Sequence, residues 1–380
     1  MPSPALRDQF PVTSRYAYLN HAAVAPLARV TRRAMEQHLD EQASGGALHW
    51  TDWLTHYERV RAIFARLVNA LPDDIALTKN TTEGLCFIAQ GLAWTPGDRI
   101  ISFESEFPAN LFPWLALRPR GVQVELLPES ALGDPDRLRA ACRGARLLAV
   151  SAVQYLSGYR APLAELGQIC RDAGTLLVVD GIQSLGAFPL DAPACGIHAL
   201  ACGGHKWLTG PAGAGFLYVE PGLLQELIPT EAGWFSVDSW EDFDVGRRAA
   251  ARSGPLTWRS GAARLECGML NGAGLLGLGA AVELLMQTGI AAIAGHILAL
   301  NQRLTAGLRT RGYEILADSR PATALSGITA FRRPGMDPGA LLQRLQAAGV
   351  LVSHRGDCIR VSPHGYNTAD EMDRLLAALP

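Results

Sequence analysis

A chain of 380 residues with 48% hydrophobic and 18% charged residues can build a large apolar core, which excludes an intrinsically disordered protein. The formal net charge of −2 provides no basic surface for nucleic acid or for an anionic membrane. The first 20 residues show no signal-peptide pattern, and no apolar run approaches the roughly 20 residues of a membrane helix. We therefore expect neither a nucleic-acid partner nor a membrane partner.

The seven cysteines are spread along the chain, at positions 86, 142, 170, 195, 202, 267 and 358. Their number is odd and no two form a CxxC pair, which argues against a disulfide framework and against a zinc site. We therefore expect no metal site, and reduced thiols in a cytoplasmic protein.

Short apolar segments alternate with helical patterns through the first two-thirds of the chain. The predicted strands, each apolar on both faces, cover residues 74–80, 98–106, 145–154, 175–180 and 213–220. Helical patterns follow the first three of these strands, at 81–94, 108–117 and 161–174. This alternation predicts an α/β fold with a mostly parallel sheet covered by helices.

The pattern changes at about residue 270, which indicates a second, smaller domain. Two helical segments come first, and strands then mix with short helices, at 271–289, 291–312, 326–333, 337–349, 350–355, 358–363 and 368–379. The polar, arginine-rich segment 236–260 is predicted to connect the two parts. We expect a large domain over 17–258, a small C-terminal α+β domain over 259–380, and an N-terminal segment, 1–16, that packs with the small domain.

The segment GAGLLG (272–277) fits the GxGxxG pattern of dinucleotide-binding folds. That motif needs a strand directly before it, whereas RLECGMLN precedes it here and the glycines continue into a helical pattern. Close helix packing explains the glycines better, so a nicotinamide oxidoreductase is not expected.

The segment ACGGHKWLTGP (201–211) places Lys206 among glycines. One interpretation is a solvated lysine in a surface turn. The other is a lysine in a tight pocket, where its amine has a chemical role. This segment alone does not separate the two.

Three other segments carry polar or aromatic groups beside predicted strand ends. In VVDGIQS (178–184), Asp180 ends a buried strand, where open α/β folds bind ligands; a turn or helix cap is the alternative. In KNTTEGL (79–85), Thr81 and Thr82 open a helix whose N–H groups suit a phosphate; an ordinary cap is the alternative. In ESEFPANLFPW (104–114), Phe107 either stacks on a flat ligand or belongs to the core.

Together these groups match the requirements of pyridoxal 5′-phosphate. Its pyridine nitrogen needs a carboxylate, its ring an aromatic neighbour, its phosphate a helix N-terminus, and its aldehyde a lysine with which to form a Schiff base. The order along the chain also fits: two threonines, an aromatic residue, Asp-x-x-Gln and His-Lys.

The chain resembles the fold-type I pyridoxal-phosphate enzymes of the aminotransferase class V family, which includes cysteine desulfurases, selenocysteine lyases and isopenicillin N epimerase-like proteins. The segments that carry the resemblance run nearly end to end: YLNHAAVAPL (18–27), VVDGIQSLG (178–186), GGHKWLTGPAGAGFLYV (203–219) and IRVSPHGYNTADEMDRLL (359–376). Members of this family are homodimers with active sites near the subunit interface, so the resemblance implies a homodimer.

The resemblance also implies roles for individual residues. Lys206 would hold the cofactor with support from His205, and Asp180 would keep the pyridine nitrogen protonated. Gln183 would touch the ring hydroxyl, and Arg360 would bind the substrate carboxylate, for which its planar fork is suited. The remaining implied contacts are Phe107 on the ring face, Thr81 and Thr82 on the phosphate, and Asn20, His21, Ala22 and Ala23 along the substrate pocket.

Three positions depart from the family pattern. Gly203 stands where many relatives have a serine or threonine, and Met269 stands where a threonine of the partner subunit often reaches the phosphate. Desulfurases carry a nucleophilic cysteine on a mobile loop, but VLVSHRGDCIRVSP (350–363) is too short for such a loop. Cys358 is therefore predicted to be a packed strand residue and not a persulfide carrier.

The predicted activity is that of an enzyme acting on an amino acid or related amine. The substrate amine would displace Lys206 to give an external aldimine, and the freed lysine would remove the α-proton. We expect β-elimination or transamination without a catalytic cysteine, with epimerisation and cysteine desulfuration as alternatives. A binding or regulatory protein that has kept the fold and lost the chemistry is the alternative from another class.

Overall fold

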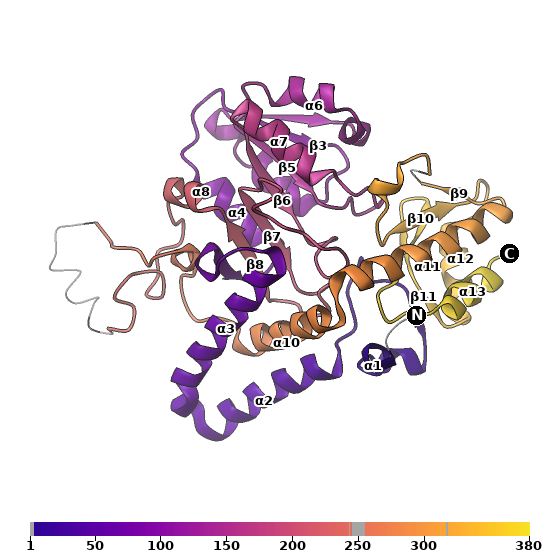
Figure 1. Cartoon of the computed structure of the whole chain (residues 1–380), viewed down its shortest axis with the longest axis horizontal. Helices are drawn as coiled ribbons and strands as arrows, with labels where there is room; N and C mark the ends of the chain where they lie inside the picture. The colour runs from indigo at the N-terminus through magenta and orange to yellow at the C-terminus, as the bar shows by residue number, and fades with distance from the viewer. Residues whose placement is uncertain (1–3, 243, 245–254, 317) are drawn as a thin grey trace.

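A seven-stranded sheet forms the centre of the larger part of the molecule (Figure 1). The computed structural model describes residues 4–242, 244, 255–316 and 318–380. The strand order is β2-β8-β7-β6-β5-β3-β4; β8 is antiparallel to both of its neighbours, and the other pairs are parallel. The strands are β2 (Ile75–Thr78), β3 (Arg99–Phe103), β4 (Gln123–Leu127), β5 (Leu147–Ser151), β6 (Leu176–Asp180), β7 (Ala199–Gly203) and β8 (Gly215–Val219). The predicted α/β fold with a mostly parallel sheet is confirmed.

Helices cover both faces of this sheet, which is why β5 and β6 are apolar up to their last residues, Ser151 and Asp180. On β5, Leu148 and Val150 face one core, whereas Leu147 and Ala149 face the other. The first core contains residues of α6 (Pro135–Cys142) and α7 (Leu163–Ala173). The second contains residues of α4 (Thr81–Gly91), α5 (Phe112–Leu115) and α8 (Pro221–Glu226).

The C-terminal part is a smaller α+β unit. Its antiparallel sheet has the order β12-β13-β10-β9, formed by β9 (Glu314–Ile315), β10 (Thr329–Arg332), β12 (Ser353–Arg355) and β13 (Cys358–Val361). Its helices are α11 (Ile290–Thr310), α12 (Pro338–Ala347) and α13 (Ala369–Ala378). This order of elements agrees with the predicted one.

The N-terminal segment packs against this smaller unit (Figure 1). After α1 (Pro4–Arg7), the ring of Phe10 stacks on Tyr366 at 4.0 Å, and the Arg7 guanidinium donates to the Tyr366 carbonyl. The contact continues past the expected limit of residue 16, because β1 (Ala17–Tyr18) pairs in parallel with β11 (Val350–Leu351).

The boundary expected at 258/259 is wrong, because α10 (Gly272–Thr288) packs on the larger part. Its partners are α2 (Arg29–Gly45) and α3 (Trp50–Val68), and its apolar residues join the core around α3. The chain passes from the larger part to the smaller unit at Gly289, where α10 and α11 meet at an angle of 78° (Figure 1). No single helix in the described ranges is long and apolar enough to cross a membrane; only this bent pair passes that test together. Much of the predicted connection at 236–260 lies outside the described residues.

The GAGLLG segment lies inside α10, where its glycines allow neighbouring helices to approach closely. A Cβ atom on Gly272 would lie 2.4 Å from His38 Nε2, and one on Gly277 would lie 2.5 Å from Met35 Cγ. This confirms that helix packing, and not a dinucleotide loop, explains the motif.

Gly279→Ala should destabilise the protein by about 1–3 kcal/mol, because the new Cβ would lie 2.7 Å from Cγ2 of buried Val60. Gly295→Ala is the matched control, since it is also within a helix but has open space around its Cβ. The free energy of unfolding of that control should rise by up to about 1 kcal/mol, because alanine has a higher helix propensity than glycine. Urea unfolding of the two variants measures the contrast, and equal effects would contradict the packing argument.

Candidate active site

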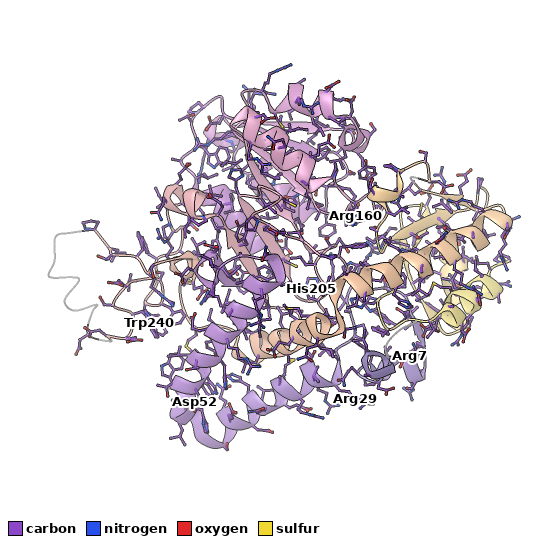
Figure 2. The ribbon with its side chains drawn as sticks, viewed as in Figure 1. Arg7, Arg29, Asp52, Arg160, His205 and Trp240 are labelled. Carbon is purple, nitrogen blue, oxygen red and sulfur yellow. The ribbon has the colours of Figure 1, made fainter. Side chains whose placement is uncertain are left out.

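A cavity of about 290 Å³ opens at the carboxyl ends of β5, β6 and β7, where open α/β sheets bind ligands. Residues 22–24, the start of α4, the segment after β3 and the β12–β13 hairpin close it. Figure 2 shows His205, one of its lining residues, where the two parts of the chain meet. The lining residues are Ala22, Ala23, Val24, Asn80, Thr81, Thr82, Phe107, Ala109, Tyr155, Asp180, Ile182, Gln183, His205, Lys206, Arg355 and Arg360.

Lys206 is only 8% exposed, which excludes the solvated-lysine interpretation. Burial lowers the pKa of its amine to about 8, against the opposing effect of Asp180. Its Nζ atom lies 5.4 Å from the centre of the Phe107 ring. Burial and the charge of Lys206 also lower the pKa of the adjacent His205, which favours a neutral imidazole.

The glycines and Trp207 hold this lysine in place. A Cβ atom on Gly204 or Gly210 would lie about 2.5 Å from Leu278 of α10, so the turn needs glycine to pack there. Trp207 is fully buried, and its indole N–H donates to the Gln183 amide oxygen at 2.8 Å. The lysine turn is therefore clamped between α10 and the segment that follows β6.

Asp180, the last residue of β6, is 2% exposed and faces the same cavity. One of its carboxylate oxygens accepts from the backbone N–H of Ile182 at 2.9 Å. Burial raises the pKa of this carboxyl to about 7, while that hydrogen bond and Lys206 oppose the rise. A cation closer to this carboxylate than Lys206 would stabilise its charged form further.

The start of α4 provides free donors at one end of the cavity. Asn80 caps the helix by accepting from the Glu83 N–H at 2.9 Å, which leaves the N–H groups of Thr81 and Thr82 without an intrahelical partner. The Thr81 hydroxyl accepts from the Gly203 N–H, whereas Thr82 is exposed. Both interpretations of this segment thus hold: it is capped, and it retains donors for an anion.

Two departures from the family pattern, Gly203 and Met269, lie at positions without steric crowding. A Cβ atom on Gly203 would meet its neighbours at 3.4 Å, an ordinary contact, so a serine could be accommodated there. Met269 is 65% exposed and is not among the residues that line this cavity. The described cavity therefore has fewer hydroxyl donors near α4 than the family pattern provides.

Phe107 is 44% exposed and its ring faces the cavity instead of the core. The buried carboxylate of Glu106 anchors it, accepting from the Ser151 N–H at 2.7 Å and from the Gln154 amide at 2.9 Å. Burial raises the pKa of Glu106, against these hydrogen bonds. The ring of Tyr155 meets Phe107 edge-on at 5.3 Å.

Arg360 reaches the cavity from β13 and is 2% exposed. One Nη donates to the Tyr155 carbonyl at 2.7 Å, whereas its buried Nε has no hydrogen-bond partner among the described residues. Burial, followed by repulsion from Arg355, lowers its pKa to about 10. A buried cation with an unused donor is arranged to receive an anion.

The structure brings ten of the twelve predicted residues together around the cavity and leaves out Asn20 and His21. His21 is buried behind the cavity, with its ring nitrogens 3.0 Å from the Ser362 carbonyl and 2.8 Å from the Tyr366 hydroxyl. Gln183 lines the cavity, but its amide already bonds to the Ala22 carbonyl and to Trp207. The placement expected for Asn20 and His21 is therefore wrong, because packing with the C-terminal unit takes them inward.

Sequence reasoning missed six lining residues: Val24, Asn80, Ala109, Tyr155, Ile182 and Arg355. Asn80 had a usable signal, since it directly precedes the two threonines at the helix start. Arg355 also had one, because Gly356 suggests a hairpin that would return the chain to Arg360.

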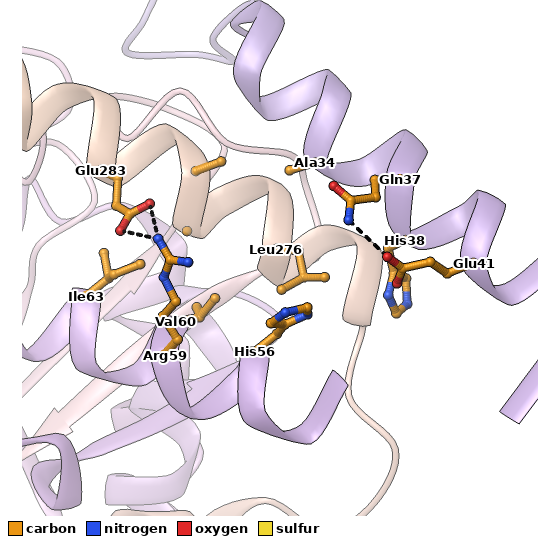
Figure 3. Close-up of a pocket in the computed structure, with 12 residues that line it drawn as sticks. Ala34, Gln37, His38, Glu41, His56, Arg59, Val60, Ile63, Leu276 and Glu283 are labelled. Atoms are coloured by element: carbon orange, nitrogen blue, oxygen red, sulfur yellow. Dashed lines mark hydrogen bonds and ion pairs between the residues drawn. The ribbon is translucent and has the colours of Figure 1, made fainter. Parts of the chain in front are cut away.

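A second cavity lies between α2, α3 and α10 (Figure 3). Its polar lining is Gln37, His38, Glu41, His56, Arg59 and Glu283. Arg59 and Glu283 pair with each other at 3.0 Å, and no lysine lines the cavity. In the described part of the chain, no group of three or more His, Cys, Asp or Glu residues is placed to hold a metal ion.

The raised pKa of Asp180 predicts a pH-dependent stability in the cofactor-free protein. Between its ordinary value of 3.8 and about 7, the folded chain keeps a proton that the unfolded chain has lost. The stabilisation from that proton is complete below pH 3.8 and is lost as the pH rises through 7. Asp180→Asn removes this titration. Between about pH 4 and 7, the free energy of unfolding of wild type should therefore fall by about 1–4 kcal/mol relative to that of the variant.

Urea unfolding at a series of pH values measures this difference, and it cancels the titrations that both proteins share. Asp40→Asn, at an exposed position on α2, is the matched control for the exchange of an aspartate for an asparagine. A constant difference between Asp180→Asn and wild type would mean that Asp180 does not have a raised pKa.

Comparison with known proteins agrees with this site. Residues 17–375 match the family model described as aminotransferase class-V. A probable cysteine desulfurase of Methanothermobacter thermautotrophicus is 31% identical, over 97% of this chain and 95% of that protein. A solved structure of a C-DES mutant with glycine covalently linked to its PLP cofactor superimposes with a TM-score of 0.89 at 26% identity, over 99% and 98% of the two chains. The structure of the cystine C–S lyase C-DES, in complex with its product cysteine persulfide, superimposes with a TM-score of 0.87 at 26% identity, over 97% of this chain and 98% of that one.

Proposed function

Because this chain belongs to the aminotransferase class V family of pyridoxal-phosphate enzymes, and acts on an amino acid, we propose that it is a lyase that uses no cysteine of its own as nucleophile. The reaction is a β-elimination: an amino acid with a leaving group on Cβ, plus water, yields a 2-oxo acid, ammonia and the protonated leaving group. The name of the related cystine C–S lyase supports this reaction type. The observation that carries the proposal is the placement of Cys358.

Cys358 is the first residue of β13 and is 2% exposed. It pairs with Arg355 across a two-residue turn, Gly356 and Asp357, in which Gly356 has a φ of +58°. So short a hairpin leaves no loop that could carry the thiol to a substrate sulfur. Burial, followed by the nearby Asp357, raises the pKa of Cys358 to about 11, which suppresses the nucleophilic thiolate.

The cavity fits pyridoxal 5′-phosphate. Lys206 presents a buried amine, Asp180 a buried carboxylate in need of a cation, Phe107 an aromatic face and α4 an N-terminus with free donors. When bound, the cofactor supplies an aldehyde that condenses with amines and a cationic ring that accepts the electron pair left by the α-proton. Asp180 would face the ring nitrogen, and Thr81 and Thr82 would lie toward the phosphate.

The chain's own residues orient the substrate and move its proton. Arg360 binds the α-carboxylate through its unused donors, which sets the position of Cα in the cavity. The Lys206 amine, with a pKa of about 8, is neutral in a useful fraction near neutral pH and takes the α-proton. Its protonated form can then donate to the departing group.

A homodimer in the cytoplasm completes the proposal. Large apolar side chains are exposed on this chain, among them Met269 at 65%, and a partner subunit would cover such groups. The seven cysteines are free thiols, as a reducing compartment requires.

Borohydride treatment of the holoenzyme should attach the cofactor permanently to Lys206. The reason is that Lys206 is the one lysine among the residues that line the cavity. Mass spectrometry of the digested protein locates the adduct, and Lys79→Arg, which alters an exposed lysine near α4, is the control. An adduct on any other lysine would reject the assigned role.

Cys358→Ser should keep kcat/KM within a few-fold of wild type, because the thiol neither lines the cavity nor ionises. Arg360→Ala should lower kcat/KM by about tenfold or more, since it removes a charged hydrogen-bond donor to the carboxylate. Product analysis with β-substituted amino acids should find the 2-oxo acid and ammonia in equal amounts.

Two results would count against the proposed lyase. Loss of activity in Cys358→Ser together with a persulfide on Cys358 of wild type would establish desulfuration. A stoichiometric 2-oxo acid without free ammonia, with the amine retained on the cofactor, would establish transamination.

A further inference from the structure

We propose that Arg355 makes this site selective for amino acids whose side chain ends in a second anionic group, such as a carboxylate. This inference rests on the proposed function, in which Arg360 takes the α-carboxylate, and it names the substrate class.

The β12–β13 hairpin places the two arginines side by side. Arg355 lies directly opposite Cys358, and Ser353 lies opposite Arg360. Residues that face each other across an antiparallel pair share one face of the sheet, and so do residues two apart on a strand. Arg355 and Arg360 are thus diagonal neighbours on one face, with Cα atoms about 7–8 Å apart, and both side chains line the cavity.

The cavity has more positive charge than its own acidic residues can balance. Its lining contains three cations, Lys206, Arg355 and Arg360, and one acidic residue, Asp180. Arg355 acts on both other cations, since its charge helps to lower the pKa of Lys206 and that of Arg360. Asp180 would pair with the cofactor ring, the start of α4 with the cofactor phosphate and Arg360 with the α-carboxylate, so none of these groups is assigned to Arg355.

Polar groups on this face also have hydrogen-bonding capacity to spare. Arg355 donates through one Nη to the His354 carbonyl at 2.9 Å, and no ion pair between described residues includes it. The Nε of Arg360 and the hydroxyl of Ser353 are buried without a hydrogen-bond partner in the described part of the chain. A small substrate with two anionic groups would supply acceptors for both arginines.

The differing exposure of the two arginines assigns their roles. Arg360 is buried and fixed by the Tyr155 carbonyl, which suits the carboxylate that every amino acid carries. Arg355 is exposed at the mouth of the cavity and can follow side chains of different length. The second anionic group would therefore lie at the outer end of the bound substrate.

The test compares anionic amino acids with neutral amides of the same shape and three lengths. The pairs are L-aspartate with L-asparagine, L-glutamate with L-glutamine, and S-carboxymethyl-L-cysteine with S-carbamoylmethyl-L-cysteine. Titration of the holoenzyme, followed by cofactor absorbance and calorimetry, gives the dissociation constant of each compound. In at least one pair the acid should bind about tenfold or more tightly than the amide.

Arg355→Gln should reduce that preference to about one, and Arg311→Gln, at an exposed position after α11, should keep it. Equal binding within all three pairs, or a preference that persists in Arg355→Gln, would overturn the inference and leave the proposed function standing. An equal loss of affinity for acid and amide would also overturn it, since Arg355 would then act on a group common to both. If no compound changed the cofactor spectrum, the proposed function would fail as well.

Discussion

The site depends on keeping the amine of Lys206 and the carboxylate of Asp180 out of water in one cavity. Burial disfavours the charged form of each group, which lowers the pKa of the lysine and raises that of the aspartate. Each group partly offsets the shift of the other, so neither would be tolerated as well alone. A ligand that supplies a cation for Asp180 and an electrophile for Lys206 would relieve both of these costs, so the two buried groups suit the cofactor of this family.

Three separate elements maintain this arrangement. The parallel strands bring Asp180 and the lysine turn to the same edge of the sheet. Helix α10 packs against the glycines of that turn, and Trp207 locks it to Gln183. Helix α10 therefore makes two separate close contacts: the glycines of GAGLLG meet α2, with a Cβ on Gly277 lying 2.5 Å from Met35 Cγ, whereas Gly204 and Gly210 of the lysine turn meet Leu278 of α10.

The β12–β13 hairpin accounts for two properties at once. Its two-residue turn keeps Cys358 in the sheet, which is the basis for proposing a reaction without a cysteine nucleophile. The same register places Arg355 and Arg360 on one face of the hairpin and so doubles the positive charge at the substrate side of the cavity. A longer loop at this point would free the cysteine and would separate the arginines, so the two properties are coupled by geometry.

Local sequence determined the fold class, most strand and helix positions and the residues at strand ends, because apolar periodicity and strand-end chemistry are properties of short segments. Lys206, Asp180 and Phe107 could be named for that reason, whereas Arg360, inside β13, was implied by the family resemblance. Tertiary structure alone decided that α10 packs with the larger part, that His21 turns inward to Tyr366, and that Arg355 joins Arg360. These depend on contacts between residues far apart in the chain or on strand register, and no single segment carries that information.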